Sequence, residues 1–331
     1  MITRRRQVLI LGAALAAPLP SRSQQSASIR RIGFLASRSR PTASNRDPYY
    51  DAFVDQMGKL GYAEGKNLLI EWRFADGRYD RLPRLASELV SMNVEVIVTH
   101  SSPGTRAAQG ATSTIPIVMT AVGDPVGSGF ARSLKRPGGN ITGLSLLVTD
   151  LTTKQFELLK MVMPGVSRVA VLMNPVNKTT MRQELKDIQG RARKLGVDVV
   201  AVNARTAEEI KAGFTRMARQ GAEALIITGD AYYAGQAGLL AELTLTNKLP
   251  SIGWYRDYVR AGVLMSYGPE TSFLYRAAAV YVDRILKGAK PDSMAIEQPT
   301  RIHLAINRRS AKALGLIVPP DLLLRANEVI D

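Results

Sequence analysis

The residues best suited to binding chemistry stand at the ends of short apolar runs in the sequence. His100, Ser101 and Ser102 follow the run Val94–Thr99, and Pro103 comes next, at a position favoured in the first turn of a helix. A serine there can cap the helix, and the free N–H groups at the helix start suit a carboxylate. We therefore expect either a plain helix cap or a carboxylate site at Ser101 and Ser102. His100 either contacts the ligand or has a structural role.

Other polar residues stand at the ends of other apolar runs. Ser37 follows a run in the first half of the chain, and Asn174 follows one in the second half. The end of a third run supplies Thr120, Ala121, Val122 and Gly123, which offer backbone groups and one hydroxyl. In open α/β sheets a ligand lies beyond the carboxyl ends of the strands, so all of these residues are candidate ligand contacts.

Aromatic residues make up only 6% of the chain, yet several stand near the ends of apolar runs in its second half. They are Tyr232, Tyr233, Trp254, Tyr255 and Tyr267. Aromatic walls with a few polar groups are typical of a small-molecule pocket, although packing between two lobes would use the same residues. Asp230, two residues before Tyr232, would pair with a ligand ammonium group or accept hydrogen bonds from backbone N–H groups.

The sequence shows few signs of catalysis or metal binding. It contains no cysteine, which excludes disulfides, thiol chemistry and thiolate metal sites. Its two histidines, His100 and His303, have no HxxxH or HxH partner, so a metal site built on imidazole is not expected. Gly61–Lys66 is one residue too short for a phosphate-binding loop and lacks the following Ser or Thr. We expect no catalytic residue, no metal and no cofactor, and an exported α/β enzyme remains an alternative.

Short apolar strands alternate with amphipathic helices along the chain. The run Ile32–Ala36 indicates a buried strand, and Phe53, Met57 and Leu60 then repeat at helical spacing. Further strands are expected at 68–74, 94–99, 117–120, 169–173, 197–202, 224–228 and 251–253, with helices between them, one of these at 105–112. This order predicts doubly wound, parallel α/β sheets.

The alternation restarts after Gly143, and one strand and one helix remain after Pro299. Two α/β sets and a returning segment predict two lobes joined by crossing hinge strands, with a ligand cleft between them. Residues 30–144 and about 268–298 would form the first lobe, and residues 145–267 and about 299–331 the second.

The first 23 residues have the order of a cleavable export signal. Arg4, Arg5 and Arg6 precede the uncharged apolar run Val8–Leu19, and small residues end at Ser23. A helix of that run would span about 18 Å, too short for a hydrocarbon core of about 30 Å, so a membrane anchor is the less favoured alternative. No cysteine follows for a lipid anchor, and the arginines leave both the Sec and the twin-arginine route open. We expect a signal peptide at 1–23 and a periplasmic protein.

The chain is strongly basic, with a formal net charge of +16. Removing residues 1–23 takes away four arginines and no acid, which leaves 16 − 4 = +12. Such a charge would suit nucleic acid, but the Lys and Arg residues are spread along the chain and no recognition motif occurs. We therefore interpret the charge as a basic solvated surface and expect no nucleic-acid partner.

Several motifs resemble those of a known family. They are Leu60–Tyr62 followed by Glu64–Leu68, Arg81–Pro83, Ala111–Val118, Gly123–Val126, Arg136–Gly143 and Val171–Pro175. They extend over nearly all of the mature chain and are similar to those of ABC transporter substrate-binding proteins of the tryptophan/tyrosine type. The resemblance implies a type I periplasmic binding protein fold, which closes like a Venus flytrap. It does not fix the ligand, because members of this family differ in what they carry.

Together, the residues and the resemblance predict the periplasmic solute-binding component of an ABC importer. It would bind a small carboxylate-bearing ligand, similar to an aromatic or apolar amino acid, and deliver it to an inner-membrane ABC permease. We expect a monomer without stable membrane insertion. A ligand-sensing domain of the same fold, feeding a signalling receptor, is the main alternative.

Overall fold

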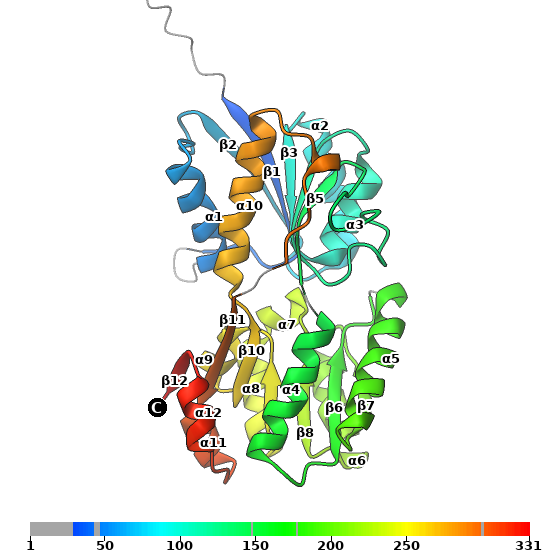
Figure 1. The fold of residues 1–331 in the computed structure, drawn as a ribbon, viewed down its shortest axis with the longest axis vertical. Helices are drawn as coiled ribbons and strands as arrows, with labels where there is room; N and C mark the ends of the chain where they lie inside the picture. Colours follow the sequence, from blue (N-terminus) through cyan, green and yellow to red (C-terminus); the bar gives the residue numbers. More distant parts are fainter. Residues whose placement is uncertain (1–28, 43–46, 147, 177, 299–300) are drawn as a thin grey trace, which may run out of the picture.

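The computed structural model describes residues 29–42, 47–146, 148–176, 178–298 and 301–331. The predicted signal peptide at 1–23 lies outside these residues. Figure 1 shows two α/β lobes stacked along the long axis, each built around one sheet. None of the helices in the described ranges is long and apolar enough to cross a membrane.

The sheet of the first lobe has five parallel strands in the order β2-β1-β3-β4-β5. They are β1 (Arg30–Ala36), β2 (Leu68–Phe74), β3 (Val96–Thr99), β4 (Ile117–Val122) and β5 (Ile141–Ser145). The helical segments of this lobe are α1 (Pro48–Lys59), the 3₁₀ turn η1 (Tyr79–Arg81), α2 (Leu82–Ser91), α3 (Ser101–Ala111), α10 (Thr271–Leu286) and the 3₁₀ turn η2 (Pro291–Ser293). From Ile32 to Ala36, strand β1 is a continuous apolar run because both of its faces are covered there, and Phe34 and Leu35, on opposite faces, are fully buried.

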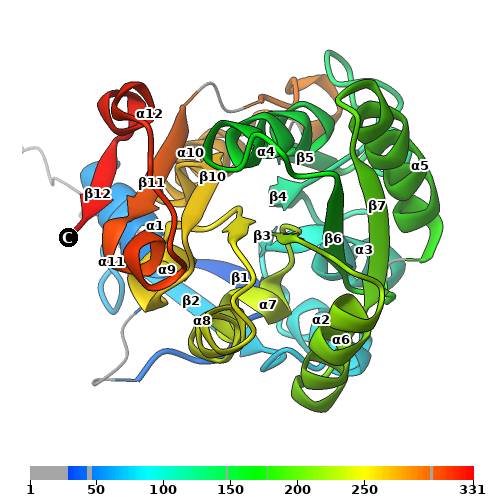
Figure 2. The same ribbon diagram turned by 90° about the horizontal axis from the view of Figure 1, so that it is seen from below.

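The sheet of the second lobe has seven strands in the order β12-β11-β10-β9-β8-β6-β7. They are β6 (Arg168–Met173), β7 (Asp198–Asn203), β8 (Ala224–Ile227), β9 (Ser251–Gly253), β10 (Met265–Pro269), β11 (Ile302–Asn307) and β12 (Glu328–Ile330). Its helices are α4 (Val148–Val162), α5 (Lys178–Lys194), α6 (Ala207–Arg219), α7 (Ala231–Gly235), α8 (Ala237–Thr246), α9 (Arg256–Ala261), α11 (Arg308–Ala313) and α12 (Pro320–Arg325). In the view along the long axis, α4, α5, α6 and α8 lie outside these strands (Figure 2).

The chain passes between the lobes after β5, after β10 and again before β11. Helix α10 follows a strand of the second sheet but packs along α1 of the first lobe, where Figure 1 shows it in orange. A bridge between Leu144 and Glu297 then ties the returning segment to β5. The prediction of two parallel-sheet lobes joined by crossing segments is confirmed, with β10 and β11 as the one antiparallel pair among the described strands.

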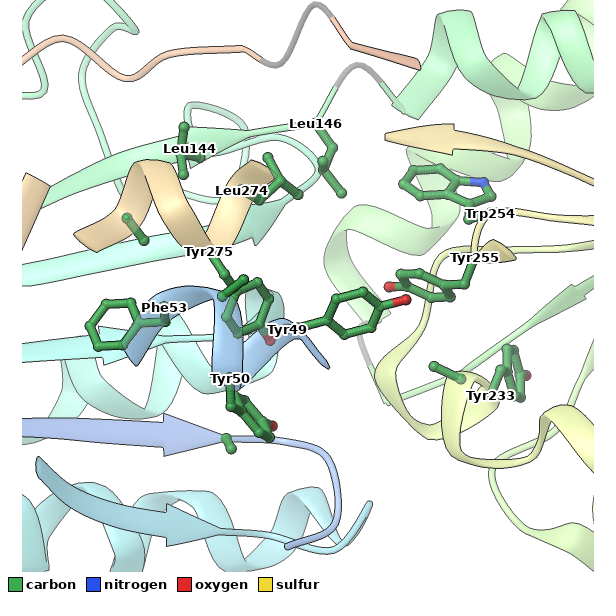
Figure 3. Packing of buried hydrophobic residues seen from close by; sticks show 14 of the residues in the cluster. Tyr49, Tyr50, Phe53, Leu144, Leu146, Tyr233, Trp254, Tyr255, Leu274 and Tyr275 are labelled. Atoms are coloured by element: carbon green, nitrogen blue, oxygen red, sulfur yellow. The ribbon is translucent and has the colours of Figure 1, made fainter. Parts of the chain in front are cut away.

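The two lobes are in direct contact through buried aromatic residues. Tyr49 and Tyr275 of the first lobe and Trp254, Tyr255 and Tyr233 of the second belong to one continuous hydrophobic cluster. Figure 3 shows the ring of Tyr49 reaching from the first lobe toward Tyr255. The lobes are therefore closed on one another, and the candidate site lies at their interface.

Candidate functional site

The candidate site begins where the strand order of the first sheet reverses, between β1 and β3. Ser37 follows β1 and His100 follows β3, so both stand at the edge where open α/β sheets bind ligands. The Ser37 hydroxyl donates to the His100 carbonyl oxygen over 3.1 Å and lies 2.9 Å from the Ser101 hydroxyl. These bonds hold the ends of the two strands together.

The second sheet reverses its order between β6 and β8, which Asn174 and Asp230 follow. The Asn174 side-chain amide donates to Asp230 Oδ1 over 3.2 Å. Oδ1 also accepts hydrogen bonds from the backbone N–H groups of Tyr232 at 2.9 Å and Tyr233 at 3.4 Å, so Asp230 caps helix α7. Asp230 therefore accepts hydrogen bonds from backbone N–H groups, which is the structural role that the sequence left open for it.

Tyr79 reaches Asp230 across the cleft, from η1 of the first lobe. Its hydroxyl lies 3.1 Å from each carboxylate oxygen of Asp230 and accepts from the backbone N–H of Tyr232 over 3.1 Å. Burial raises the pKa of Asp230 above its ordinary value, while the hydrogen bonds it accepts oppose the rise. Burial and the nearby carboxylate raise the pKa of Tyr79 well above its ordinary value, so the hydroxyl remains a donor.

A second contact between the lobes involves residues of the first lobe that lie in the loop after β1 and at the start of α1. The Tyr49 hydroxyl donates to Asp257 Oδ2 of the second lobe over 2.7 Å. Arg38 lies above the Tyr49 ring, with its guanidinium carbon 4.9 Å from the ring centre. The Arg38 guanidinium is 3.4 Å from Asp47 and 4.0 Å from Asp257, so it lies between carboxylates of the two lobes.

His100 is a buried, neutral side chain beside this cluster. It is 1% exposed, and its ring centre lies 5.9 Å from that of Tyr275. Burial, and to a smaller degree the charge of Arg38, lowers its pKa from 6.5 to about 3. A neutral imidazole has one donor and one acceptor nitrogen, and among the described residues neither nitrogen has a hydrogen-bond partner. The ring therefore retains its full capacity to bind a polar group.

Helix α3 begins at Ser101, four residues before the range 105–112 and two before Pro103, which was expected in its first turn. Its N-cap is His100, whose side chain makes no capping bond, so the expectation that Ser101 or Ser102 caps the helix is wrong. Ser101 itself has φ 70°, a left-handed conformation that turns the chain from the strand into the helix.

Ser102 faces a cavity of about 520 Å³ that Tyr79 and Val176 also line. The uncapped N–H groups of this turn remain available to an anion.

Some residues that were predicted to contact the ligand have side chains that make contacts inside the first lobe instead. Thr120, Ala121 and Val122 lie within β4, which is longer than expected. The Thr120 hydroxyl donates to the Thr99 carbonyl oxygen over 3.0 Å, and Val122 is packed in the core of the first lobe. These two side chains therefore do not belong to the cleft surface. Gly123 follows the strand at its cleft end.

The predicted aromatic residues are divided between the cleft and the sheet. Trp254 is 3% exposed and lies against Gly229, where an added Cβ would be 2.3 Å from the indole ring. Among the described residues, its indole N–H has no hydrogen-bond partner. Tyr232 packs against Gly77 of the opposite lobe. Tyr267 lies in β10, away from the reversal between β6 and β8, and its carbonyl oxygen accepts from Gln155 over 2.9 Å.

Several residues at this interface were not predicted from the sequence. They are Arg38, Tyr49, Tyr79, Asp257 and Tyr275. Arg38 directly follows the predicted Ser37, and Asp257 lies two residues after Tyr255, so strand-end position could have indicated both. The three tyrosines lie in or beside the first turns of helical segments, where sequence offers no signal for contact with another lobe. The described part of the chain contains no group of three or more His, Cys, Asp or Glu side chains that could hold a metal ion.

Similarity to known proteins covers most of the chain. The family model for "ABC transporter substrate binding protein" matches residues 43–330. A tyrosine-binding protein of Clostridioides difficile is 26% identical over 265 residues, which are 80% of this chain and 75% of that protein. The structure of a conserved domain protein from Vibrio cholerae is 27% identical, with a TM-score of 0.84 over 91% of this chain and 100% of that chain.

An ABC domain from Streptococcus pneumoniae in complex with L-Trp is 25% identical, with a TM-score of 0.83 over 92% of this chain and 100% of that chain. More distant solute binding proteins share the same two-lobed fold, which confirms the predicted type I periplasmic binding protein architecture. The chain therefore belongs to the family of ABC transporter substrate binding proteins, which are binding proteins and not enzymes.

Proposed function

We propose that the protein is the periplasmic solute receptor of an ABC importer and holds a small amino-acid-like ligand between its lobes. The observation that carries the proposal is that the strand-order reversals of both sheets meet at one interface, with His100 on one side and Asp230 on the other. Open α/β sheets bind ligands at such reversals. Membership of the family supports delivery of the solute to an inner-membrane permease.

The polar ends of the ligand would be held by opposite lobes. The uncapped start of α3, with Ser101 and Ser102, would take the carboxylate, and the unpaired His100 ring stands next to it. Asp230 Oδ2, whose one hydrogen-bond partner among the described residues is the Tyr79 hydroxyl, would accept from the ammonium group. Ser37 and Asn174 would hold these two ends in place through the hydrogen bonds they make within each lobe.

The apolar part of the ligand would lie against the aromatic side chains of the second lobe. Trp254 and Tyr232 supply this wall, and the free indole N–H of Trp254 could bind a polar substituent. A tyrosine-binding relative and a related structure in complex with L-Trp support an aromatic amino acid as the ligand. The ligand class is therefore an aromatic or apolar amino acid or a related carboxylate.

Mass spectrometry of ligand released from protein purified from its native host tests this proposal. The expected result is an aromatic or apolar amino acid, or a related carboxylate, recovered chemically unchanged. Recovery of a sugar would contradict the ligand class. Deletion of the protein should abolish uptake of the recovered compound, whereas intact uptake together with a lost signalling response would support the sensor alternative.

The order of the first 23 residues supports export of the protein to the periplasm. The mature protein is proposed to begin near Gln24, to be monomeric and to lie in the periplasm. Cell fractionation with N-terminal sequencing checks this. Full-length protein retained in the inner membrane would contradict export.

A further inference from the structure

Among the direct contacts that join the lobes, three are made by Tyr79, Tyr49 and Gly77, and none of these needs a ligand to complete it. The Tyr79 hydroxyl bonds to Asp230 and to the Tyr232 N–H, and the Tyr49 hydroxyl bonds to Asp257. The third is the packing of Gly77 against the ring of Tyr232. In each case one partner belongs to the first lobe and the other to the second.

The carboxylates that accept these bonds both lie at the start of a helix in the second lobe. Asp230 is held by the Asn174 amide and by the first turn of α7, at 3.2 and 2.9 Å. Asp257 lies in the first turn of α9, where the helix dipole favours a negative charge. Asp230 is therefore already in place when closure brings the Tyr79 hydroxyl to it, and forming this bond requires little further ordering of the acceptor.

The Tyr49 hydroxyl is shielded from water, whereas Tyr79 is half-buried and lines the cavity of about 520 Å³. Tyr49 is 1% exposed, and burial followed by the charge of Asp257 raises its pKa, so it stays protonated. Hydrogen bonds from neutral donors to charged acceptors are stronger than those between neutral groups. The Tyr79 and Tyr49 bonds are thus suited to hold the lobes together.

We propose that Tyr79 and Tyr49 are positioning residues that close the lobes without solute, so that the free protein populates a closed state. Solute is then held by a closed state that part of the free protein already adopts. The apparent dissociation constant is the dissociation constant of the closed state divided by the fraction of free protein that is closed. This last consequence rests on the proposed function, whereas closure of the free protein does not.

The distance between two spin labels, one on each lobe, measures closure directly. The chain contains no cysteine, so Ser91→Cys on α2 and Arg219→Cys on α6 provide the only labelling sites. Both positions are exposed, and both helices lie on the side of the molecule away from α10 and the crossing segments (Figures 1 and 2). Opening of the cleft therefore lengthens this distance.

Tyr79→Phe and Tyr49→Phe remove one hydroxyl each and leave the rings in place. In ligand-free protein, each variant is expected to lower the ratio of closed to open molecules about tenfold, which corresponds to 1.4 kcal/mol. The matched control is Tyr281→Phe, because the Tyr281 hydroxyl donates to the Ala295 carbonyl oxygen within the first lobe. This variant is expected to keep the wild-type distance distribution.

The proposal is overturned if the labelled, ligand-free wild type is entirely open, or if Tyr79→Phe and Tyr49→Phe leave its distances unchanged. An equal shift in Tyr281→Phe would also overturn it, since the effect would then be a general loss of rigidity. With L-tryptophan as the probe, affinity should fall in proportion to the closed fraction. Failure of tryptophan to bind would count against the proposed function but not against closure, which is measured without it.

Discussion

The side-chain amide of Asn174 donates a hydrogen bond to Asp230 Oδ1 over 3.2 Å, across the point where the second sheet reverses its strand order. This bond and the first turn of α7 occupy Oδ1, and Oδ2 is left facing the Tyr79 hydroxyl. A carboxylate has about four lone-pair sites, so Asp230 can serve its helix and still accept from a ligand. The structural and the ligand-binding interpretations of Asp230 are therefore compatible.

Asp230→Asn distinguishes ligand classes. An asparagine can still cap α7, but it removes the charge that would pair with an ammonium group. Affinity for L-tryptophan should fall at least tenfold, whereas affinity for an aromatic acid without the amine should stay the same or rise. Isothermal titration calorimetry with both compounds measures this. Equal losses for the two would show that Asp230 acts only through the fold.

Trp254→Ala should weaken binding more than Ser102→Ala. Enclosing about 100 Å² of apolar ring at about 25 cal/mol/Å² contributes near 2.5 kcal/mol, whereas a helix N-terminus contributes about 0.3–1 kcal/mol and up to about 2 when partly buried. Calorimetry against L-tryptophan gives both values, and circular dichroism checks that the variants fold. Unchanged affinity in both variants would show that the site lies elsewhere.

His100 should make stability depend on pH below neutrality. Its pKa is lowered to about 3 in the folded protein, whereas in the unfolded chain it is about 6.5. Between these values the unfolded state binds one more proton, so stability falls as pH falls below 6.5, by up to about 1.4 kcal/mol per pH unit.

The comparison with His100→Gln isolates this effect, because the other titrating groups are the same in both proteins. Urea unfolding from pH 6.5 to 4.5 should show a steeper loss of free energy of unfolding in the wild type. Parallel slopes would mean that the imidazole is hydrated and protonates in the folded state.

Gly77→Ala should force the lobes apart. Gly77 has φ 74°, and an added Cβ would be 2.7 Å from the Tyr232 ring of the other lobe. Gly65→Ala is the matched control, since Gly65 has φ 79° and no atom within 4 Å of the added Cβ. Both variants bear a similar backbone strain of about 1–2 kcal/mol, but only Gly77→Ala should lengthen the distance between the labelled lobes. The same distances in both would argue that the Tyr232 ring simply moves away.

The sheets could be predicted because most of their central strands are buried on both faces. Runs such as Ile32–Ala36 and Val169–Met173 are apolar throughout, and the helices between them are long enough to show a periodic pattern. Helices α7 and α9 were not predicted, since five or six residues are too few to show one. The early start of α3 was missed because Ser101 adopts a left-handed conformation that its residue type does not indicate.

The site could be predicted only as far as the strand ends. Ser37, His100, Asn174 and Asp230 stand at the two reversals because topology alone brings strand ends together. The contact of Tyr79 with Asp230 joins residues 151 positions apart and depends on how the lobes face one another. Local sequence patterns do not indicate how the two lobes are oriented, so this contact between the lobes could be found only in the structure.

Calorimetric titration of the mature protein with L-tryptophan, L-tyrosine, L-phenylalanine and the corresponding acids without an amine measures whether the protein binds a ligand of the proposed class. We expect at least one of them to bind at about micromolar affinity, near −8 kcal/mol, and Trp254→Ala to weaken this binding. No binding by any compound of the panel, together with tight binding of a sugar or another solute without a carboxylate, would contradict it.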